Sequence, residues 1–244
     1  LLHGRDPARL KKTLSDIKSK AVSDKLETYV ADFSSLEDVR RLAKNIADRH
    51  QRIDVLVNNA GIGRGPRGQQ TRETSQDHVE MRFQVNHLAP FLLTHLLLPL
   101  LVGHAPARIV NVASASQGSI DFEDLMLERT YDGTRAYSQS KLAMVMATFE
   151  MAKRLEPNNV TVNALHPGSL LDTKIVREAW GHAHGPVEIG IKSEFYLAAS
   201  SELDGVSGKY FDGKIPVQAH PQAYDESARQ RLWEISMNLV GLPG

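Results

Sequence analysis

Short apolar runs alternate with helical patterns along most of this chain, and that alternation constrains the fold more than any other feature. Four runs have the length and composition of buried strands, at residues 27–30, 53–59, 108–114 and 160–168. Between them, apolar residues recur at helical spacing around 35–50, 75–102 and 135–155. Apolar strands separated by helices are typical of a parallel sheet that is covered on both sides. The sequence therefore predicts an α/β fold, with a doubly wound parallel sheet and helices on both faces.

Two helices can be placed from their capping residues and periodicity. Ser35, followed three residues later by Asp38, predicts the start of the helix after the first apolar run. Its apolar residues form one stripe, at Leu36, Val39, Leu42, Ala43 and Ile46. Near the end of the chain, residues 206–213 predict a turn into a last strand, and the residues after it predict a final helix. That helix should turn inward Leu232, Ile235 and Leu239.

Composition limits the classes of function. Basic and acidic residues balance at 29 each, which gives no electrostatic reason to expect nucleic acid or an anionic membrane as a partner. The sequence has no cysteine, which excludes disulfides and thiolate metal sites and fits the cytoplasmic location that we expect. The longest apolar run, 88–102, is shorter than the roughly 20 residues of a membrane-spanning helix, so we expect a buried core helix there.

Polar or glycine-containing residues stand where each apolar run ends. Asp32 follows the first run, the second ends in Asn-Asn-Ala-Gly at 58–61, and Ser114 ends the third. The fourth ends in Pro167 and Gly168. Ligands bind to a parallel sheet beyond the carboxyl ends of its strands. The sequence therefore predicts a binding crevice at this edge.

Tyr137 and Lys141 lie four residues apart in a helical segment, so they share one face of the helix. A lysine ammonium beside a phenol stabilises the phenolate and lowers its pKa from the reference of about 10. A phenol tuned in this way can pass a proton to or from a carbonyl or alcohol oxygen. Alone, this spacing is common in ordinary amphipathic helices, and its meaning depends on the residues around it.

The surrounding motifs supply that context. Asn-Asn-Ala-Gly at 58–61, Asn86, Ser114, Tyr137-x-x-x-Lys141 and Pro167-Gly168 occur in an order that resembles the short-chain dehydrogenase/reductase family over nearly the whole chain. The resemblance implies one Rossmann-like domain over residues 1–244 and an NAD(P)-dependent enzyme acting on CH–OH or C=O groups. It implies that Tyr137 is the general acid/base and that Ser114 holds the substrate oxygen. Lys141 would lower the tyrosine pKa and bind the nicotinamide ribose, and Asn86 would hold a water that links Lys141 to solvent.

Two further features refine this resemblance. Residues 108–137 and the tail 228–242 resemble the branch that contains retinol dehydrogenases and WW-domain oxidoreductases, which does not fix the substrate. The segment after the third run offers two serines, Ser114 and Ser116. Ser114 is favoured, because it takes the second place of the family's serine pair, and Ser116 is then a loop hydroxyl.

The resemblance also implies a set of cofactor-binding residues. Besides Tyr137 and Lys141, they are Arg5, Asp32, Phe33, Asn59, Ala60, Gly61, Pro167, Gly168, Leu170 and Thr173. Residues 174–185 would form a substrate lid. Its two histidines, His182 and His184, do not make a metal site without further ligands, and no metal is predicted. His166 is expected to be a packing residue rather than a proton carrier.

The family's glycine-rich phosphate turn has no counterpart in the sequence. The glycines of 61–68 follow a later strand and include Pro66, so they predict a surface loop. By analogy the first βα unit is missing, Leu1 to His3 finish the next strand, and we expect the chain to bind the cofactor poorly without preceding residues. Gly4 stands where an acidic residue would select NAD, and Arg5 after it suits a 2′-phosphate. We therefore expect NADP(H), with NAD as the alternative, and Asp6 as the N-cap of a helix that begins with Pro7.

Two functional hypotheses follow. The first is an oxidoreductase that transfers a hydride between NADP(H) and the carbonyl or alcohol group of a small apolar molecule. The alternative is a non-enzymatic relative, a binding or interaction protein without a working cofactor site. The resemblance also allows a homodimer that pairs through the helices at 75–102 and 135–155.

Overall fold

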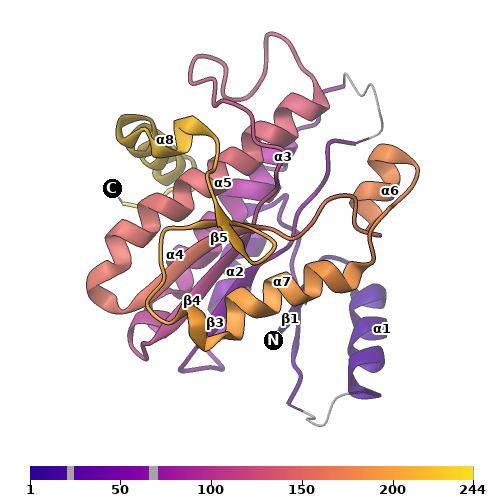
Figure 1. The fold of residues 1–244 in the computed structure, drawn as a ribbon, viewed down its shortest axis with the longest axis vertical. Helices are drawn as coiled ribbons and strands as arrows, with labels where there is room; N and C mark the ends of the chain where they lie inside the picture. The colour runs from indigo at the N-terminus through magenta and orange to yellow at the C-terminus, as the bar shows by residue number, and fades with distance from the viewer. Residues whose placement is uncertain (21–24, 66–70, 244) are drawn as a thin grey trace.

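The computed structural model describes residues 1–20, 25–65 and 71–243, and their strands form two sheets (Figure 1). The strands are β1 (Leu2–Gly4), β2 (Thr28–Val30), β3 (Val55–Asn58), β4 (Ala107–Val112), β5 (Val160–His166), β6 (Tyr210–Asp212) and β7 (Ile215–Val217). β1 and β2 pair in parallel, and the second sheet has the order β3-β4-β5-β6-β7, parallel except for its last pair. Within the described residues, β1 and β3 each pair with a strand on one side only.

Helices cover the strands on both faces (Figure 1). They are α1 (Pro7–Lys18), α2 (Leu36–Ala47), α3 (Met81–Phe83), α4 (Ala89–Val102), α5 (Gly133–Leu155), α6 (Lys174–Trp180), α7 (Val187–Ala199) and α8 (Glu226–Leu239). α1 packs on β1 and β2, and α7 packs on β4 and β5. α4 and α5 pack on the opposite face of the second sheet, with α2 against α4 and α8 against α5. The predicted α/β architecture is confirmed.

The apolar core lies on both faces of β4 and β5. Residues of β4 alternate between a large cluster under α4 and α5, which contains Ile109, and a smaller cluster under α7, which contains Val110. β3 departs from the prediction of strands buried on both faces, because Val55 and Val57 are 39% and 38% exposed. Leu56 packs against the large cluster under α4, while Val55 and Val57 alternate to the other face of the strand.

The helix starts that the sequence predicts are confirmed. Asp6 accepts hydrogen bonds from two backbone N–H groups of α1, and Pro7 is the first residue of that helix. Ser35 caps α2 by accepting the N–H of Asp38. The five apolar residues predicted to form its stripe are all buried.

Several elements differ from the sequence-based expectation. The helix expected from 75 begins only at Met81, because an isolated bridge joins Thr74 to Glu80 and His78 takes a left-handed φ of 61° in the turn between them. α7 and β7 were not predicted, because neither has a strong apolar period. In α8, Leu239 is 37% exposed, and Val240 is buried instead.

The helical segment Met81–Val102 comprises α3, a π-helical turn and α4. By length and composition it could cross a membrane, since it has 22 residues and a mean hydropathy of 1.6. In this fold, however, 67% of that window is buried against the protein. A core helix passes the same test, which makes the length of the segment weak support for a membrane span.

α8 covers part of the surface formed by α4 and α5. The Trp233 ring lies edge-on to Phe91, with centroids 4.9 Å apart, and the Arg154 guanidinium lies 4.5 Å from the Trp233 ring. His87 on the same surface hydrogen-bonds the Ser236 hydroxyl at 2.8 Å. Trp233 is thus a packing residue. The homodimer stays a prediction, and α8 occupies part of the face that it would use.

Candidate active site

Ser114 and Tyr137 meet at the carboxyl end of β4. Ser114 lies two residues beyond the strand and is 8% exposed, and Tyr137 comes from the first turns of α5. The two side chains are close enough for a hydrogen bond that affects the titration of the phenol. Ser116 is exposed, and its hydroxyl pairs with Ser138 at 2.7 Å. Ser116 therefore lies in the loop, as expected, and Ser114 is the serine that lies beside Tyr137.

Lys141 lies one turn further along α5 and is almost fully buried. Its ammonium donates to the carbonyl of Val112 at 2.7 Å and lies 6.0 Å from the centre of the Tyr137 ring. Burial lowers the pKa of Lys141 to about 8. The Lys141 ammonium is therefore mostly charged at pH 7, and it loses its proton in a pH range in which enzyme rates can be measured.

Burial raises the pKa of Tyr137, because the phenol is desolvated, and the hydrogen bond with Ser114 opposes that shift. That the Lys141 ammonium lowers the tyrosine pKa stays a prediction. A phenol that stays protonated at neutral pH is suited to donate a proton to an oxygen.

Asn86 lies in the π-helical turn Gln84–Leu88 and ties the loop after β3 to α5. Its side chain accepts the N–H of Ile62 at 2.8 Å and donates to the Ile62 carbonyl at 3.0 Å. It also donates to the Ser140 hydroxyl at 2.9 Å. π-helical turns are frequent at functional sites. The structure thus shows Asn86 as an anchor, and its water-holding role stays a prediction.

The backbone at Gly61 passes close to these groups. A Cβ at this position would lie 3.0 Å from Asn86 Oδ1 and 3.7 Å from Lys141 Nζ. Asn59, which directly follows β3, is exposed, and Ala60 is half-buried. Because Gly61 has no side chain, space is left beside Lys141. The family resemblance implies that the nicotinamide ribose binds at Lys141.

The loop after β5 contains two residues with a positive φ. Gly168 takes a φ of +142° and Leu170 a φ of +50°, and Pro167 precedes them. The Leu170 carbonyl accepts the N–H groups of His184 and Gly185, which join this loop to the segment after α6. Pro167, Gly168 and Leu170 are therefore held at the strand end where the sequence places them.

Thr173 and His166 have structural partners. The Thr173 hydroxyl accepts the N–H of Val176 at 3.4 Å and is the N-cap of α6, which leaves its O–H as a donor; its contact with the cofactor stays a prediction. His166 Nε2 lies 3.1 Å from the Ser169 hydroxyl. Burial lowers the pKa of His166 and favours its neutral form. A neutral, hydrogen-bonded imidazole agrees with the packing role expected for it.

The residues predicted for the adenosine end lie at the ends of β1 and β2. Register pairs Gly4 with Val30, so Arg5 and the residues after β2 extend from neighbouring strand ends. Arg5 is exposed, and the Asp32 carboxylate accepts the Ser34 N–H at 2.9 Å. Phe33 is buried, and its ring stacks on His3 at 4.4 Å. Arg5 and Asp32 are thus the polar side chains at this end.

α6 rests on the loop that follows β3. Arg64 donates to the Ala179 carbonyl at 2.9 Å, and its guanidinium lies 3.8 Å from the centre of the Trp180 ring. Gly63 makes room for Ile175, whose Cγ2 would lie 2.7 Å from a Cβ there. Residues of the segment 174–185 therefore lie against residues 63–64, and its role as a lid stays a prediction. Over the parts of the chain that the structure describes, no cluster of three or more His, Asp or Glu could hold a metal ion.

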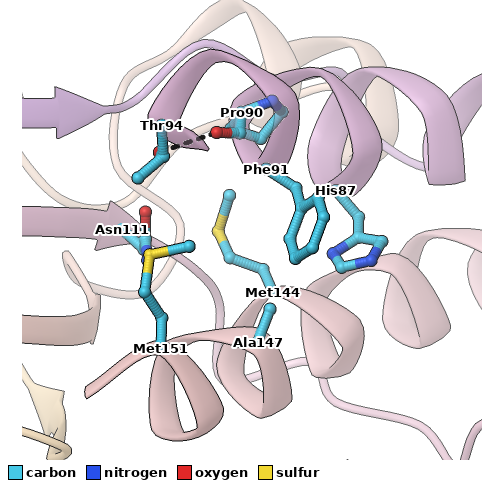
Figure 2. Close-up of a pocket in the computed structure, with 8 residues that line it drawn as sticks. All are labelled: His87, Pro90, Phe91, Thr94, Asn111, Met144, Ala147 and Met151. Carbon is cyan, nitrogen blue, oxygen red and sulfur yellow. Dashed lines mark hydrogen bonds between the residues drawn. The ribbon is translucent and has the colours of Figure 1, made fainter. Parts of the chain in front are cut away.

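A small pocket lies apart from these residues, between α4 and α5 (Figure 2). Its lining is His87, Pro90, Phe91, Thr94, Asn111, Met144, Ala147 and Met151. The Thr94 hydroxyl donates to the Pro90 carbonyl at 2.7 Å, as Figure 2 shows. None of the predicted catalytic side chains lines it, so it is a packing gap behind the site rather than the substrate pocket.

Comparisons with known proteins agree with this geometry. A family model for short chain dehydrogenases matches residues 1–183. Retinol dehydrogenase 13 from Homo sapiens is 40% identical over 260 residues, covering 99% of this chain and 77% of that protein. Retinol dehydrogenase 14 from Homo sapiens is 43% identical over 227 residues, covering 86% and 66%. A crystal structure of an uncharacterized protein from Mycobacterium paratuberculosis has a TM-score of 0.76 and 28% identity, covering 99% of this chain and 84% of that one.

Mostly parallel strands with helices on both faces, and polar residues at the carboxyl ends of those strands, are typical of the α/β folds that bind nucleotides. The chain belongs to the short-chain dehydrogenase/reductase family, in the branch that contains the retinol dehydrogenases. Its class of activity is that of an NAD(P)-dependent oxidoreductase acting on alcohol or carbonyl groups. The substrate and the choice between NAD and NADP are not given by family membership.

Proposed function

We propose that this chain reduces and oxidises the carbonyl/alcohol group of a small apolar molecule with NADP(H), and that Tyr137 transfers the proton. The observation that carries the proposal is the meeting of Ser114 and Tyr137 beside the buried charge of Lys141 at the end of β4. A serine hydroxyl and a phenol on one oxygen are the groups that carbonyl reduction needs.

The side chains divide the work as follows. Ser114 and Tyr137 hydrogen-bond the carbonyl oxygen and orient it. NADP(H), when bound, supplies or accepts the hydride at the neighbouring carbon. As negative charge grows on the oxygen, Tyr137 gives it the phenolic proton, and the Lys141 ammonium stabilises the phenolate that is left. In alcohol oxidation the same groups act in reverse, and Tyr137 accepts the proton.

An apolar substrate is favoured by the side chains around Gly168. Leu171 and Ile189 come within 3.2 Å and 3.4 Å of the position that a Cβ of Gly168 would take. Ile189 and Trp180 are about half exposed, at 48% and 50%. Two of the relatives reported above are named retinol dehydrogenases, and retinol is an apolar alcohol. A screen that follows NADPH oxidation with apolar aldehydes, ketones and retinoids tests this proposal. Polar sugars and hydroxy acids as the better substrates would overturn it.

Arg5 supports NADP(H) over NAD(H), because its exposed guanidinium follows β1 directly and can pair with a 2′-phosphate. We expect Arg5→Ala to reduce the ratio of kcat/KM for NADPH to that for NADH by on the order of tenfold, the value of one charge-assisted hydrogen bond. Arg9→Ala, in the first turn of α1 and also exposed, is the matched control and should leave the ratio unchanged. An unaltered ratio in the Arg5 variant would remove the argument for NADP(H).

The pKa of Lys141 gives the reaction a pH dependence. Since burial holds this pKa at about 8, the ammonium is present below pH 8 and is lost as the pH rises above it. We expect kcat/KM for carbonyl reduction to be flat near neutral pH and to fall about tenfold per pH unit above 8. In Lys141→Arg the charge does not titrate, so the remaining activity should lack this alkaline decline. An identical decline in both proteins would show that another group causes it.

The burial of Lys141 beside Ser114 and Tyr137 argues against the alternative of a non-enzymatic relative. A binding protein has no need to bury a lysine beside a serine and tyrosine pair, and burial of such a charge is costly. The requirement for a preceding glycine-rich segment stays a sequence-based prediction, which NADPH titration of this chain and of any longer natural chain would test.

A further inference from the structure

Ser114 has a second set of partners that the proposed reaction does not use. Its peptide carbonyl accepts a hydrogen bond from the Tyr210 hydroxyl at 3.0 Å and another from Gln117 Nε2 at 3.1 Å. The last backbone bond from β4 toward β5 is donated by Ala113, to Leu165. Beyond that point the chain leaves the sheet, and two side chains take over the pairing of the backbone carbonyl.

Tyr210 is built into the fold for this contact. It is the first residue of β6, is 5% exposed, and pairs in register with Ala164 of β5. Its hydroxyl therefore reaches across the end of β5 to the end of β4. Burial raises the pKa of Tyr210 to about 12, so the hydroxyl stays a donor throughout the working pH range.

Gln117 completes the arrangement from the loop side. While its amide donates to Ser114, its carbonyl oxygen accepts the N–H of His220 at 2.9 Å. The Ser114 hydroxyl itself accepts the N–H of Ser116 at 3.1 Å. The Ser114 carbonyl is thus held by two hydrogen bonds and its hydroxyl by a third, which limits the directions in which the hydroxyl can point.

We propose that Tyr210 is a positioning residue for the reaction: with Gln117 it fixes the Ser114 peptide and so aims the Ser114 hydroxyl at the substrate oxygen beside Tyr137. Ser114 then interacts with two tyrosines: its hydroxyl hydrogen-bonds Tyr137, and its carbonyl accepts a hydrogen bond from Tyr210. The inference rests on the proposed function, because it assumes that Ser114 contacts the substrate oxygen. Catalysis is sensitive to such aiming, since small misplacements of a reacting group reduce the rate strongly.

The test uses Tyr210→Phe, which keeps the buried ring and removes the donor. We expect kcat for carbonyl reduction to fall about two- to tenfold, the value of one net hydrogen bond, with the dissociation constant of NADPH unchanged. Gln117→Leu should lower kcat in the same direction. Tyr196→Phe is the matched control, because its hydroxyl bonds Glu202 at 2.8 Å on the surface, and it should leave kcat unchanged.

A double-mutant cycle separates positioning from a general structural effect. In a Ser114→Ala background, Tyr210→Phe should change the residual kcat less than twofold, because no hydroxyl is left to aim. The same loss in both backgrounds, or no loss from Tyr210→Phe alone, would overturn the inference. If Tyr210→Phe fails to fold, the cycle is run with Gln117→Leu. Full activity in Tyr137→Phe would instead overturn the proposed function, so the two failures are distinguishable.

Discussion

Tyr137→Phe lowers kcat by about 10²–10⁴-fold, the usual contribution of a general acid, while NADPH affinity stays within a few fold. The ring keeps its place in α5, and only the hydroxyl beside Ser114 is lost. Steady-state rates with an apolar aldehyde measure the first effect. Quenching or enhancement of NADPH fluorescence on titration measures the second. The split between kcat and cofactor affinity is the signature of a group that acts on the proton alone.

Tyr224→Phe is the matched control for this variant. Its hydroxyl accepts the N–H of Ala219 at 3.0 Å, and the residue is 47% exposed. We expect this variant to keep wild-type kcat. If Tyr137→Phe also kept wild-type turnover, the proton would come from another group and the proposed mechanism would be wrong.

Arg82→Leu has the largest effect expected on stability, a fall in the free energy of unfolding of about 3–5 kcal/mol. Arg82 and Glu80 are 2% and 1% exposed, with a charged nitrogen and oxygen 3.5 Å apart. Tyr131 joins them by accepting from Arg82 at 2.6 Å and donating to Glu80 at 3.1 Å. Removal of the guanidinium leaves a carboxylate buried without its cation. Urea denaturation followed by circular dichroism measures the loss.

The same variant should also loosen the loop after β3, because Arg82 donates to the carbonyls of Gly63 and Arg64. Adding Glu80→Gln should restore much of the lost stability by removing the uncompensated charge. Arg52→Leu breaks an exposed pair with Asp54 and serves as the surface control, with little change expected. If Arg82→Leu were as stable as the Arg52 variant, the buried cluster would not hold this part of the fold.

The positions of the predicted site residues in the fold could be read from the sequence, because these residues lie at strand ends and apolar runs mark where strands end. Asp32, Gly61, Ser114 and Gly168 each follow a run that the structure confirms as a strand. Tyr137 and Lys141 are placed by helical spacing in α5. Local pattern therefore suffices for residues whose position depends on a single element.

Contacts between distant elements were not predictable in the same way. Tyr210 of β6 bonds the Ser114 carbonyl across β5. The position of strand ends in the sequence predicts which residues lie near the site, and it does not predict which side chain bonds which carbonyl. The raised pKa of Tyr137 depends on burial, which spacing along a helix does not reveal. α7 was missed because its exposed face carries Ile191 and Phe195, which obscure the apolar period.

The transfer of a hydride to a carbonyl carbon is the central claim, and isotopic labelling tests it most directly. The protein is incubated with NADPH that carries deuterium at the transferable position and with a panel of apolar aldehydes, and the alcohols are analysed by mass spectrometry. The account predicts that the wild-type protein forms alcohol carrying a single deuterium on the former carbonyl carbon, and that Tyr137→Phe forms almost none. Alcohol without deuterium, or equal labelling by both proteins, would contradict it.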